Sequence, residues 1–370
     1  MGFSNIMDSN SYSPDHPVDP ATGSLIAARD QLLGPSYRLF YDRPIHLVRG
    51  VGTKLYDIND ACFLDAYNNV ASVGHCHPHV VQAVSRQLGT LNTHTRYLHS
   101  GIVDYSERLL VTLPEQVNRV MYACTGSEVN DLALRIAEMH TGAKGVVITR
   151  DAYHGNTAAV TAISPSLGGR TSIGEHVRIV DPPDSYRIPA GELADRFAAD
   201  VTTAIADLNA AGIGLSALIV DTIFSSDGIY PDPSVLAPTV ASVRRAGGVF
   251  IADEVQPGFG RTGESMWGFV RHGVVPDIVT MGKPMGSGMP IAAVAARADV
   301  LEAFGDGVAY FNTFGGNPVT IAAAAAVLDV IEDEKLIANA ADVGRLLRDE
   351  LILVTQGHPR IGEVRGTGLY

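Results

Sequence analysis

Short apolar runs alternate with helical patterns through the middle of this chain, and this alternation constrains the fold more than any other feature. The segments between the runs carry apolar residues at helical spacing. The runs lie at residues 146–148, 218–220, 249–251, 278–280 and 291–294. Strands that are apolar on both faces are typical of a mostly parallel sheet covered by helices on both sides. We therefore predict an α/β large domain over residues 60–305.

The two ends of the chain show other patterns. Strand-like segments lie at residues 45–57, 62–65 and 361–370, with a turn at Asn59–Asp60, and helical segments lie at residues 318–332 and 335–351. We expect both ends to build one smaller α+β domain. Residues 1–59 would hold the N-terminal segment and part of this domain, and residues 306–370 would hold the rest.

Composition favours a globular enzyme that acts on small molecules. The 370 residues are 46% hydrophobic and 18% charged, and the net charge is -13. Because nucleic-acid binding needs a clustered basic surface, this charge argues against such a partner. No run approaches the length of a membrane-spanning helix. The N-terminal residues 1–20 lack the apolar centre of a targeting peptide, and the three dispersed cysteines suit a reducing compartment, so we expect a cytoplasmic protein.

Lys283 is the strongest candidate for a catalytic residue. It lies between Gly282 and Pro284 just after the run 278–280, and Asp253 closes the apolar run before it. A lysine in apolar surroundings loses its proton readily and forms Schiff bases with carbonyl groups. An aspartate facing a pyridine nitrogen keeps that ring protonated and able to accept electrons. The pair predicts a pyridoxal 5′-phosphate site.

Two nucleotide-binding interpretations compete with this one. A strand that ends in Asp253–Glu254 also occurs in magnesium-dependent ATPases, and the glycines of residues 258–263 match a dinucleotide fingerprint, which would make the protein a nicotinamide-linked oxidoreductase. However, the sequence contains no P-loop, and residues 264–268 do not begin a long helix. A visible absorbance that Lys283→Ala removes would exclude the oxidoreductase.

Thr125–Glu128 opens a predicted helix over residues 128–141. Unpaired backbone N–H groups and the positive end of the helix dipole make such a start an anion site, suited to the cofactor phosphate. A plain capping box, with Thr125 as N-cap, explains the same residues. Both interpretations remain open from the sequence.

A loop that follows the strand ending near Thr149 places Tyr153 and His154 at the carboxyl edge of the sheet. We expect Tyr153 to stack on the pyridine ring, although such rings often serve only packing. Gln256 is a candidate donor to the phenolic oxygen of the cofactor, or simply a polar loop residue.

Three histidines at positions 75, 77 and 79 suggest a metal site at first. Neighbouring side chains alternate in direction, and Pro78 is suited to the first turn of a helix, so tetrahedral coordination is awkward. We predict no metal.

Taken together, these segments resemble the class III (ω-type) aminotransferase family of fold-type I pyridoxal phosphate enzymes. The resemblance covers about nine-tenths of the chain. It is carried by residues 34–36, 64–70, 74–78, 125–130, 153–155, 253–256, 281–284 and 311–318.

The resemblance implies a role for each matching residue. Lys283 would form the Schiff base, Asp253 would pair with the pyridine nitrogen, and Val255 and Tyr153 would lie on opposite sides of the ring. Gly126 and Ser127 would hold the cofactor phosphate. Thr313 would reach the cofactor phosphate of a neighbouring subunit, which implies a homodimer with shared active sites.

Three stretches are most similar to the phospho-lyase branch of the family, whose substrates are phosphoethanolamine and phosphohydroxylysine. These are residues 34–38, 91–99 and 276–286. The resemblance implies elimination of phosphate from a small phosphorylated amine. Phosphoethanolamine is favoured because phosphohydroxylysine carries a carboxylate for which the sequence shows no partner. Tyr37, Arg38 and Arg96 are candidates to bind the substrate phosphate, although exposed surface positions explain them equally well. The alternative activity is amino transfer from an amine to a keto acid.

The chain also departs from the family pattern. Cys124–Thr125 replaces Asn-Ser, which the anion site tolerates because its donors are backbone groups. Asp221 stands where a glutamate is common, and the shorter side chain puts in doubt the arginine switch that two-substrate aminotransferases use. The sequence ends at Tyr370, where relatives continue their small domain, and the resemblance implies that substrate-carboxylate arginines usually lie beyond this point.

Overall fold

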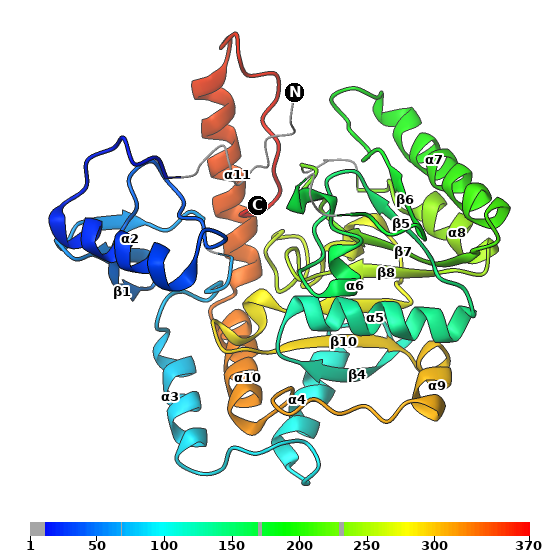
Figure 1. Ribbon diagram of the computed structural model, residues 1–370, viewed down its shortest axis with the longest axis horizontal. Coiled ribbons are helices and arrows are strands. Elements are labelled where there is room, and N and C mark those ends of the chain that lie inside the picture. Colours follow the sequence, from blue (N-terminus) through cyan, green and yellow to red (C-terminus); the bar gives the residue numbers. More distant parts are fainter. Residues whose placement is uncertain (1–11, 68, 169–171, 229–232) are drawn as a thin grey trace.

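A seven-stranded sheet forms the centre of the molecule (Figure 1). The computed structural model describes residues 12–67, 69–168, 172–228 and 233–370. The strand order is β4-β10-β9-β8-β7-β5-β6. The bounds are β4 (Val117–Ala123), β5 (Gly145–Thr149), β6 (Val177–Val180), β7 (Leu215–Asp221), β8 (Val249–Asp253), β9 (Ile278–Met281) and β10 (Ala292–Arg297). Neighbours from β9 to β6 are parallel, whereas β10 runs antiparallel to both β9 and β4. The predicted mostly parallel α/β sheet is confirmed.

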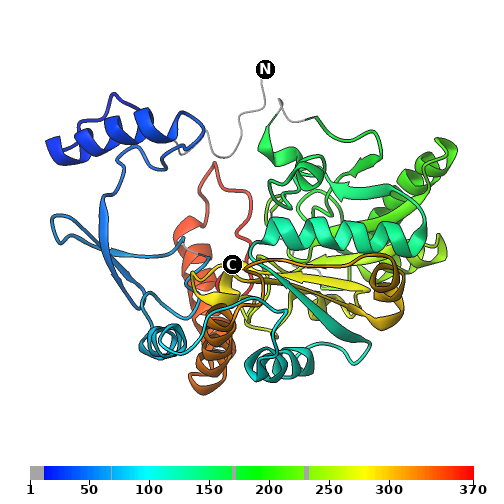
Figure 2. The same ribbon diagram turned by 60° about the horizontal axis from the view of Figure 1, so that its bottom comes forward.

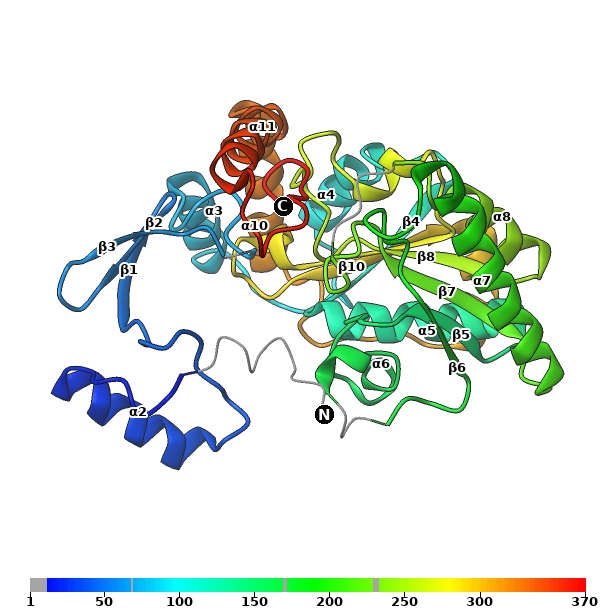
Figure 3. The ribbon, with the colours of Figure 1, turned by 90° about the horizontal axis from the view of Figure 1, so that it is seen from above.

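Helices cover both faces of this sheet and create two separate cores (Figures 1 and 3). Along β5, Val146 and Ile148 enter one core with α5 (Gly126–Thr141) and α9 (Ala298–Gly307). Val147, between them, enters the other core with α7 (Ala190–Ala210) and α8 (Ala237–Arg245). Because both faces are buried, the strands are continuously apolar, as the sequence indicated.

The remaining large elements come from the two ends of the chain. They are α2 (Pro20–Leu33), β1 (Leu47–Val51), β2 (Lys54–Asp57), β3 (Cys62–Leu64), α3 (Pro78–Leu88), α4 (Ser100–Val111), α10 (Pro318–Asp333) and α11 (Leu336–Thr355). Strands β1 to β3 form a small antiparallel sheet. Helices α10 and α11 lie between this sheet and the central sheet (Figures 2 and 3). In the described part of the chain, no helix is both long and apolar enough to cross a membrane.

The strand predicted over residues 361–370 is wrong. Backbone hydrogen bonds join Thr367 N to Tyr370 O and Tyr370 N to Thr367 O, and together they close a turn. Gly368 adopts a positive φ of 54°, which interrupts an extended strand. The turn packs on α11 at Gly344, where an added Cβ would lie 1.9 Å from Gly368 O. Two backbones therefore meet here without a side chain between them.

Short helical turns complete the chain near the carboxyl edge of the sheet. They are α6 (Ala158–Thr161), η1 (Pro165–Leu167), η2 (Gly268–His272) and η3 (Lys283–Gly286). Element η3 starts directly after β9 and connects it to β10. This short connection reverses the chain and explains why β10 is antiparallel, in contrast to the helix-linked strands.

Candidate active site

The carboxyl ends of three neighbouring strands bring the predicted catalytic residues together. Asp221 ends β7 and is paired in register with Asp253, which ends β8. Asp253 is in turn paired with Thr280 on β9, and Lys283 follows that strand. Ligands of open α/β sheets bind at this edge. The fold thus brings Asp253 and Lys283, 30 positions apart in the sequence, to neighbouring strand ends.

Asp253 is held by three hydrogen-bond donors inside the protein. One carboxylate oxygen accepts from His154 Nδ1 at 2.7 Å and from Asn130 Nδ2 at 2.9 Å, and the other accepts from Val255 N at 3.1 Å. Asn130 also donates to the backbone oxygen of His154 at 2.8 Å. All but Val255 are buried. The carboxylate is therefore fixed before any ligand arrives.

His154 and Tyr153 are adjacent in the sequence but differ in burial and contacts. The side chain of His154 is 1% exposed and lies against Asp253, whereas Tyr153 is 41% exposed on the same loop. Sequence analysis placed His154 only beside Tyr153 and missed Asn130. Asn130 lies on the buried face of α5 between Val129 and Ala133, and a polar residue on an apolar helix face was the signal available for it.

Lys283 is suited to act as a nucleophile and base. Its Nζ donates to Gln256 Oε1 at 2.7 Å. Burial lowers the pKa of the Lys283 amine, and the negative charges of Asp253 and Asp221 only partly oppose this effect. A larger fraction of the amine is therefore neutral than for an exposed lysine, which is the form that attacks a carbonyl or accepts a proton.

Gln256 connects Lys283 to two residues that the sequence did not indicate. Gln256 Oε1 also accepts from Asn69 Nδ2 at 3.0 Å, and Gln256 Nε2 donates to Tyr370 Oη at 3.4 Å. Burial raises the pKa of the Tyr370 phenol, so it stays neutral. Residues from both ends of the chain thus complete the surroundings of Lys283.

The start of α5 combines the two structures proposed for it. Thr125 and Glu128 form a capping box, in which Thr125 Oγ1 accepts from Glu128 N at 3.2 Å and Glu128 Oε2 accepts from Thr125 N at 2.9 Å. The box does not use the backbone N–H groups of Gly126 and Ser127. The capping box and an anion site are therefore compatible here.

Glycines allow close approach of the segments around this helix start. A Cβ on Gly126 would lie 2.9 Å from Val255 Cγ1, and one on Gly282 would lie 3.6 Å from the backbone nitrogen of Gly126. On the other side, a Cβ on Gly155 would lie 2.4 Å from Ser127 Oγ. Glycines thus let Val255 and the lysine turn lie close to the helix start, and the donor set there suits a phosphorylated pyridine.

The candidates for substrate phosphate and the partner-reaching threonine lie on exposed segments. Tyr37 is exposed under the guanidinium of Arg29, and Arg38 is exposed beside it. Arg96 stacks over the ring of Phe311 at 4.0 Å, close in sequence to the exposed Thr313. The structure groups Arg96 with the segment that carries Thr313.

The three histidines of the 75–79 run bind separate carboxylates. The pairs are His75–Asp65 at 2.6 Å, His77–Glu334 at 2.9 Å and His79–Asp329 at 2.7 Å. Pro78 begins α3, as predicted. Over the residues that the structure describes, no group of three or more potential ligands is arranged to hold a metal ion.

Two further acidic side chains at this edge, Asp221 and Glu254, accept hydrogen bonds from nearby loop residues. Asp221 accepts from Ile223 N at 3.0 Å and from both the backbone and the hydroxyl of Ser225. Burial and then the charge of Asp253 raise the pKa of Asp221 to about 6. Glu254 is enclosed by three donors, from Thr222, Gly268 and Phe269. Glu254 therefore supports the loop that follows β8, and its oxygens are not available as the ATPase interpretation required.

The family model for class-III aminotransferases matches residues 40–370. This chain belongs to the class-III aminotransferase family. Its cofactor is accordingly pyridoxal 5′-phosphate, and the fold-type I architecture is confirmed. The family assignment replaces the nucleotide-binding interpretations. In addition, residues 258–263 form turns, and the next helical element is the short η2, whereas a dinucleotide fingerprint opens a long helix.

Similar proteins include both lyases and aminotransferases. A solved phospholyase from Arthrobacter in complex with phosphoethanolamine is 44% identical, with a TM-score of 0.90, and the match covers 93% of this chain and 82% of that one. Ethanolamine-phosphate phospho-lyase homolog 1 of Caenorhabditis elegans is 36% identical over 94% of this chain and 78% of its own length. Alanine--glyoxylate aminotransferase 2-like of Drosophila melanogaster is 39% identical over 93% of this chain and 72% of its own length.

Proposed function

We propose that this protein is a phospho-lyase that eliminates phosphate from a small phosphorylated amine, with O-phosphoethanolamine as the substrate. The observation that carries the proposal is the likeness, at 44% identity, to a phospholyase bound to phosphoethanolamine. The position of Lys283 beside Gln256 supports it. In the overall reaction, phosphoethanolamine and water would give acetaldehyde, ammonia and inorganic phosphate.

Each residue of the site would have one task. Bound pyridoxal phosphate supplies an electron-accepting ring. Asp253 would pair with the pyridine nitrogen, and Val255 and Tyr153 would contact opposite sides of the ring. Gly126 and Ser127 would bind the cofactor phosphate through the start of α5. Gln256 would donate to the phenolic oxygen.

Lys283 would be both the attachment point and the base. After the substrate amine displaces it, its neutral Nζ would take the proton from the carbon next to the substrate nitrogen. The adjacent C–O bond then breaks, and its electron pair leaves with the phosphate. Hydrolysis of the remaining fragment gives the aldehyde and ammonia. Where the substrate has no leaving group, Lys283 would instead return the proton to a different carbon from the one that lost it, and amino transfer would follow.

Amino transfer is the second candidate activity, because the Drosophila relative is named as an aminotransferase. Asp221 argues against efficient switching between two substrates. Its oxygens cap the turn at Ile223 and Ser225, and the side chain is shorter than the glutamate common in the family. This departure favours the lyase.

A homodimer would complete the site. Large apolar side chains are exposed on two segments, residues 91–98 and 309–314, which also carry Arg96 and Thr313. The exposed apolar residues there are Leu91, Tyr97, Leu98, Phe311 and Phe314. Such a surface fits a second copy of the chain, in which Thr313 would reach the cofactor phosphate of the neighbouring subunit. Arg96 would accompany it, and Tyr37 and Arg38 remain proposed partners of the substrate phosphate.

We further propose the domain division at residues 59/60 and 305/306, with the small domain built from both ends of the chain. The position of α10 and α11 beside the small sheet supports this division (Figure 3). The three cysteines are free thiols, which supports a reducing compartment such as the cytoplasm.

Incubation with phosphoethanolamine tests the proposal. Release of inorganic phosphate and acetaldehyde without any keto acid would support the lyase, and transfer of the amino group to pyruvate or 2-oxoglutarate would support the aminotransferase. Borohydride treatment of the cofactor-loaded protein should attach the cofactor to Lys283, and peptide mapping locates the adduct. If the adduct lies elsewhere, the assignment of Lys283 is wrong.

A further inference from the structure

Arg261 is a cationic residue of this site that still lacks a function. It is half-buried in the loop between β8 and η2. In the described residues, its guanidinium donates one hydrogen bond, from Nη2 to Asn69 O at 3.3 Å, and forms no ion pair. Its Nε is shielded from solvent and has no partner. Because a shielded charge with unused donors is costly, such an arginine is expected to have an anionic ligand.

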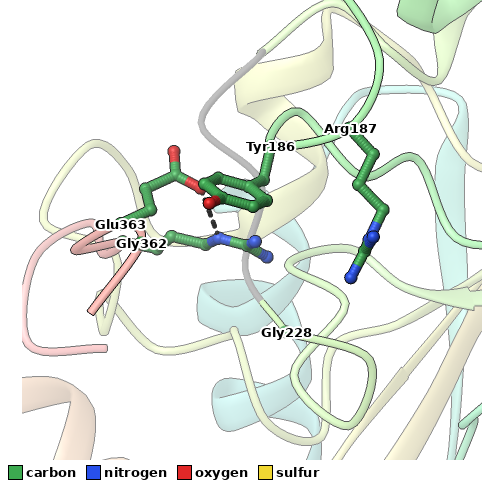
Figure 4. A pocket seen from close by; sticks show the side chains of 6 residues that line it. Tyr186, Arg187, Gly228, Gly362 and Glu363 are labelled. Atoms are coloured by element: carbon green, nitrogen blue, oxygen red, sulfur yellow. Dashed lines mark hydrogen bonds and ion pairs between the residues drawn. The ribbon is translucent and has the colours of Figure 1, made fainter. Parts of the chain in front are cut away.

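Two other arginines with low exposure, Arg365 and Arg271, are already neutralised. Tyr186, Arg187 and Glu363 line a cavity of about 560 Å³ (Figure 4). Arg365 lines the same cavity, but it is bound to Glu363 at 2.8 Å and to Asp184 at 3.2 Å. Arg271 is likewise bound to Glu264 at 3.1 Å. Arg261 differs from both because its charge has no carboxylate beside it.

Arg261 lies next to the group that handles the substrate amine. Asn69 connects the two, since its backbone oxygen accepts from Arg261 and its side chain donates to Gln256, which in turn accepts from Lys283. The charge of Arg261 also contributes to the lowered pKa of Lys283. In phosphoethanolamine, only two carbons and one oxygen separate the amine from the phosphorus. A substrate whose amine is at Lys283 would therefore hold its phosphate only a few bonds from that lysine, on which the charge of Arg261 acts.

The backbone around Arg261 is rigid. Phe259 and Gly260 have positive φ angles of 62° and 79°, and the Phe259 ring packs on Trp267 at 5.1 Å. Past the arginine, a Cβ on Gly263 would lie 2.5 Å from the backbone of α11 at Ala341. A strained and tightly packed turn of this kind is typical of residues that hold a ligand.

We propose that Arg261 binds the phosphate group of the substrate and so selects phosphorylated amines. This assignment rests on the proposed function. The guanidinium offers paired donors to phosphate oxygens, and its charge stabilises the phosphate as the electron pair of the broken C–O bond moves onto it. Arg38 and Arg96, in contrast, lie on exposed segments.

The test compares Arg261→Gln, Arg261→Lys and the control Arg345→Gln, an exposed arginine on α11. Inorganic phosphate is titrated into each cofactor-loaded protein by calorimetry, and the KM for phosphoethanolamine is measured in parallel. We expect Arg261→Gln to weaken phosphate binding and raise KM by about 10- to 100-fold, the effect of losing charged hydrogen bonds. Arg261→Lys should show a smaller loss, and Arg345→Gln none.

The outcomes separate this inference from the proposed function. If the wild-type protein releases no phosphate from phosphoethanolamine, the lyase proposal fails, but the phosphate titration still decides whether Arg261 binds the anion. If the wild-type protein is a lyase and both Arg261 variants, with full visible absorbance of the cofactor, bind phosphate as tightly as the control, Arg261 does not form the phosphate site. A loss confined to Arg96→Gln would also overturn it.

Discussion

The strand-end region and the exposed segments of the same molecule differ in how complete they are. At the strand ends, Asp253 is enclosed by donors from α5 and from the loop after β5, and Lys283 already has its partner Gln256. The segments 91–98 and 309–314 instead present apolar side chains and Thr313 to the outside. At the strand ends, one chain supplies the groups that we propose face the cofactor ring, whereas the exposed segments carry the surface that we propose meets a second copy.

The strongest test of this contrast is Asp253→Asn. The amide keeps the shape of the side chain but removes the negative charge proposed to face the pyridine nitrogen. We expect kcat for phosphate release to fall by about 10²- to 10³-fold, the range for loss of a fixed electrostatic group. Asp299→Asn, at an exposed position, serves as control. An unchanged kcat would mean that the strand ends do not supply the ring's counter-charge.

The burial of the strand ends can be checked by measuring the free energy of unfolding as a function of pH. The pKa of Asp221 is raised from 3.8 to about 6 by burial and the charge of Asp253. Between these values the folded state keeps a proton that the unfolded chain releases, so the free energy of unfolding should decrease as pH rises from about 4 to about 6. Asp221→Asn should remove up to about 3 kcal/mol of this variation. Urea unfolding of the cofactor-free protein at several pH values measures it, and an unaltered slope would contradict the assignment.

Two histidine–aspartate pairs give a matched comparison of buried and exposed contacts. His154–Asp253 and His79–Asp329 have the same N–O distance of 2.7 Å, but the histidine side chains are 1% and 44% exposed. We expect His154→Gln to lower the free energy of unfolding by about 2 kcal/mol, because buried Asp253 loses a donor. His79→Gln should cost less than about 1 kcal/mol. Equal losses would show that burial does not distinguish the two pairs.

The smallest expected effect is that of Thr313→Val on the exposed segment. Loss of one hydroxyl should weaken cofactor affinity by about 2- to 10-fold and leave the stability of the cofactor-free chain unchanged. A hybrid dimer sharpens the test: Thr313→Val on one chain and Lys283→Ala on the other separate the two sites. If Thr313 crosses, its substitution falls in the site that has lost its lysine, so the site with intact Lys283 should bind the cofactor with wild-type affinity. A weakened affinity at the intact Lys283 site would show that Thr313 does not cross to its neighbour.

Much of the strand-end region was predictable, because a charged residue at or just after a continuous apolar strand is easily recognised in a sequence. Asp253 ends one such strand, and Lys283 follows another. β4 was missed because Asn118 and Arg119 interrupt its apolar pattern and are exposed in the edge strand. Asn69 and Tyr370 were missed because the fold alone brings them to Gln256 across 187 and 114 residues. Sequence periodicity carries no signal for such contacts.

The direct backbone contact between Gly344 and Gly368 has a mechanical consequence. With no side chain there to yield, a displacement of α11 must carry the adjoining turn with it, and that turn holds the phenol hydrogen-bonded to Gln256. A movement of α11 would consequently reach the Lys283 amine through Tyr370 and Gln256. A bulkier residue at position 344 should therefore displace the Lys283 amine, although no residue that contacts the ligand has been changed.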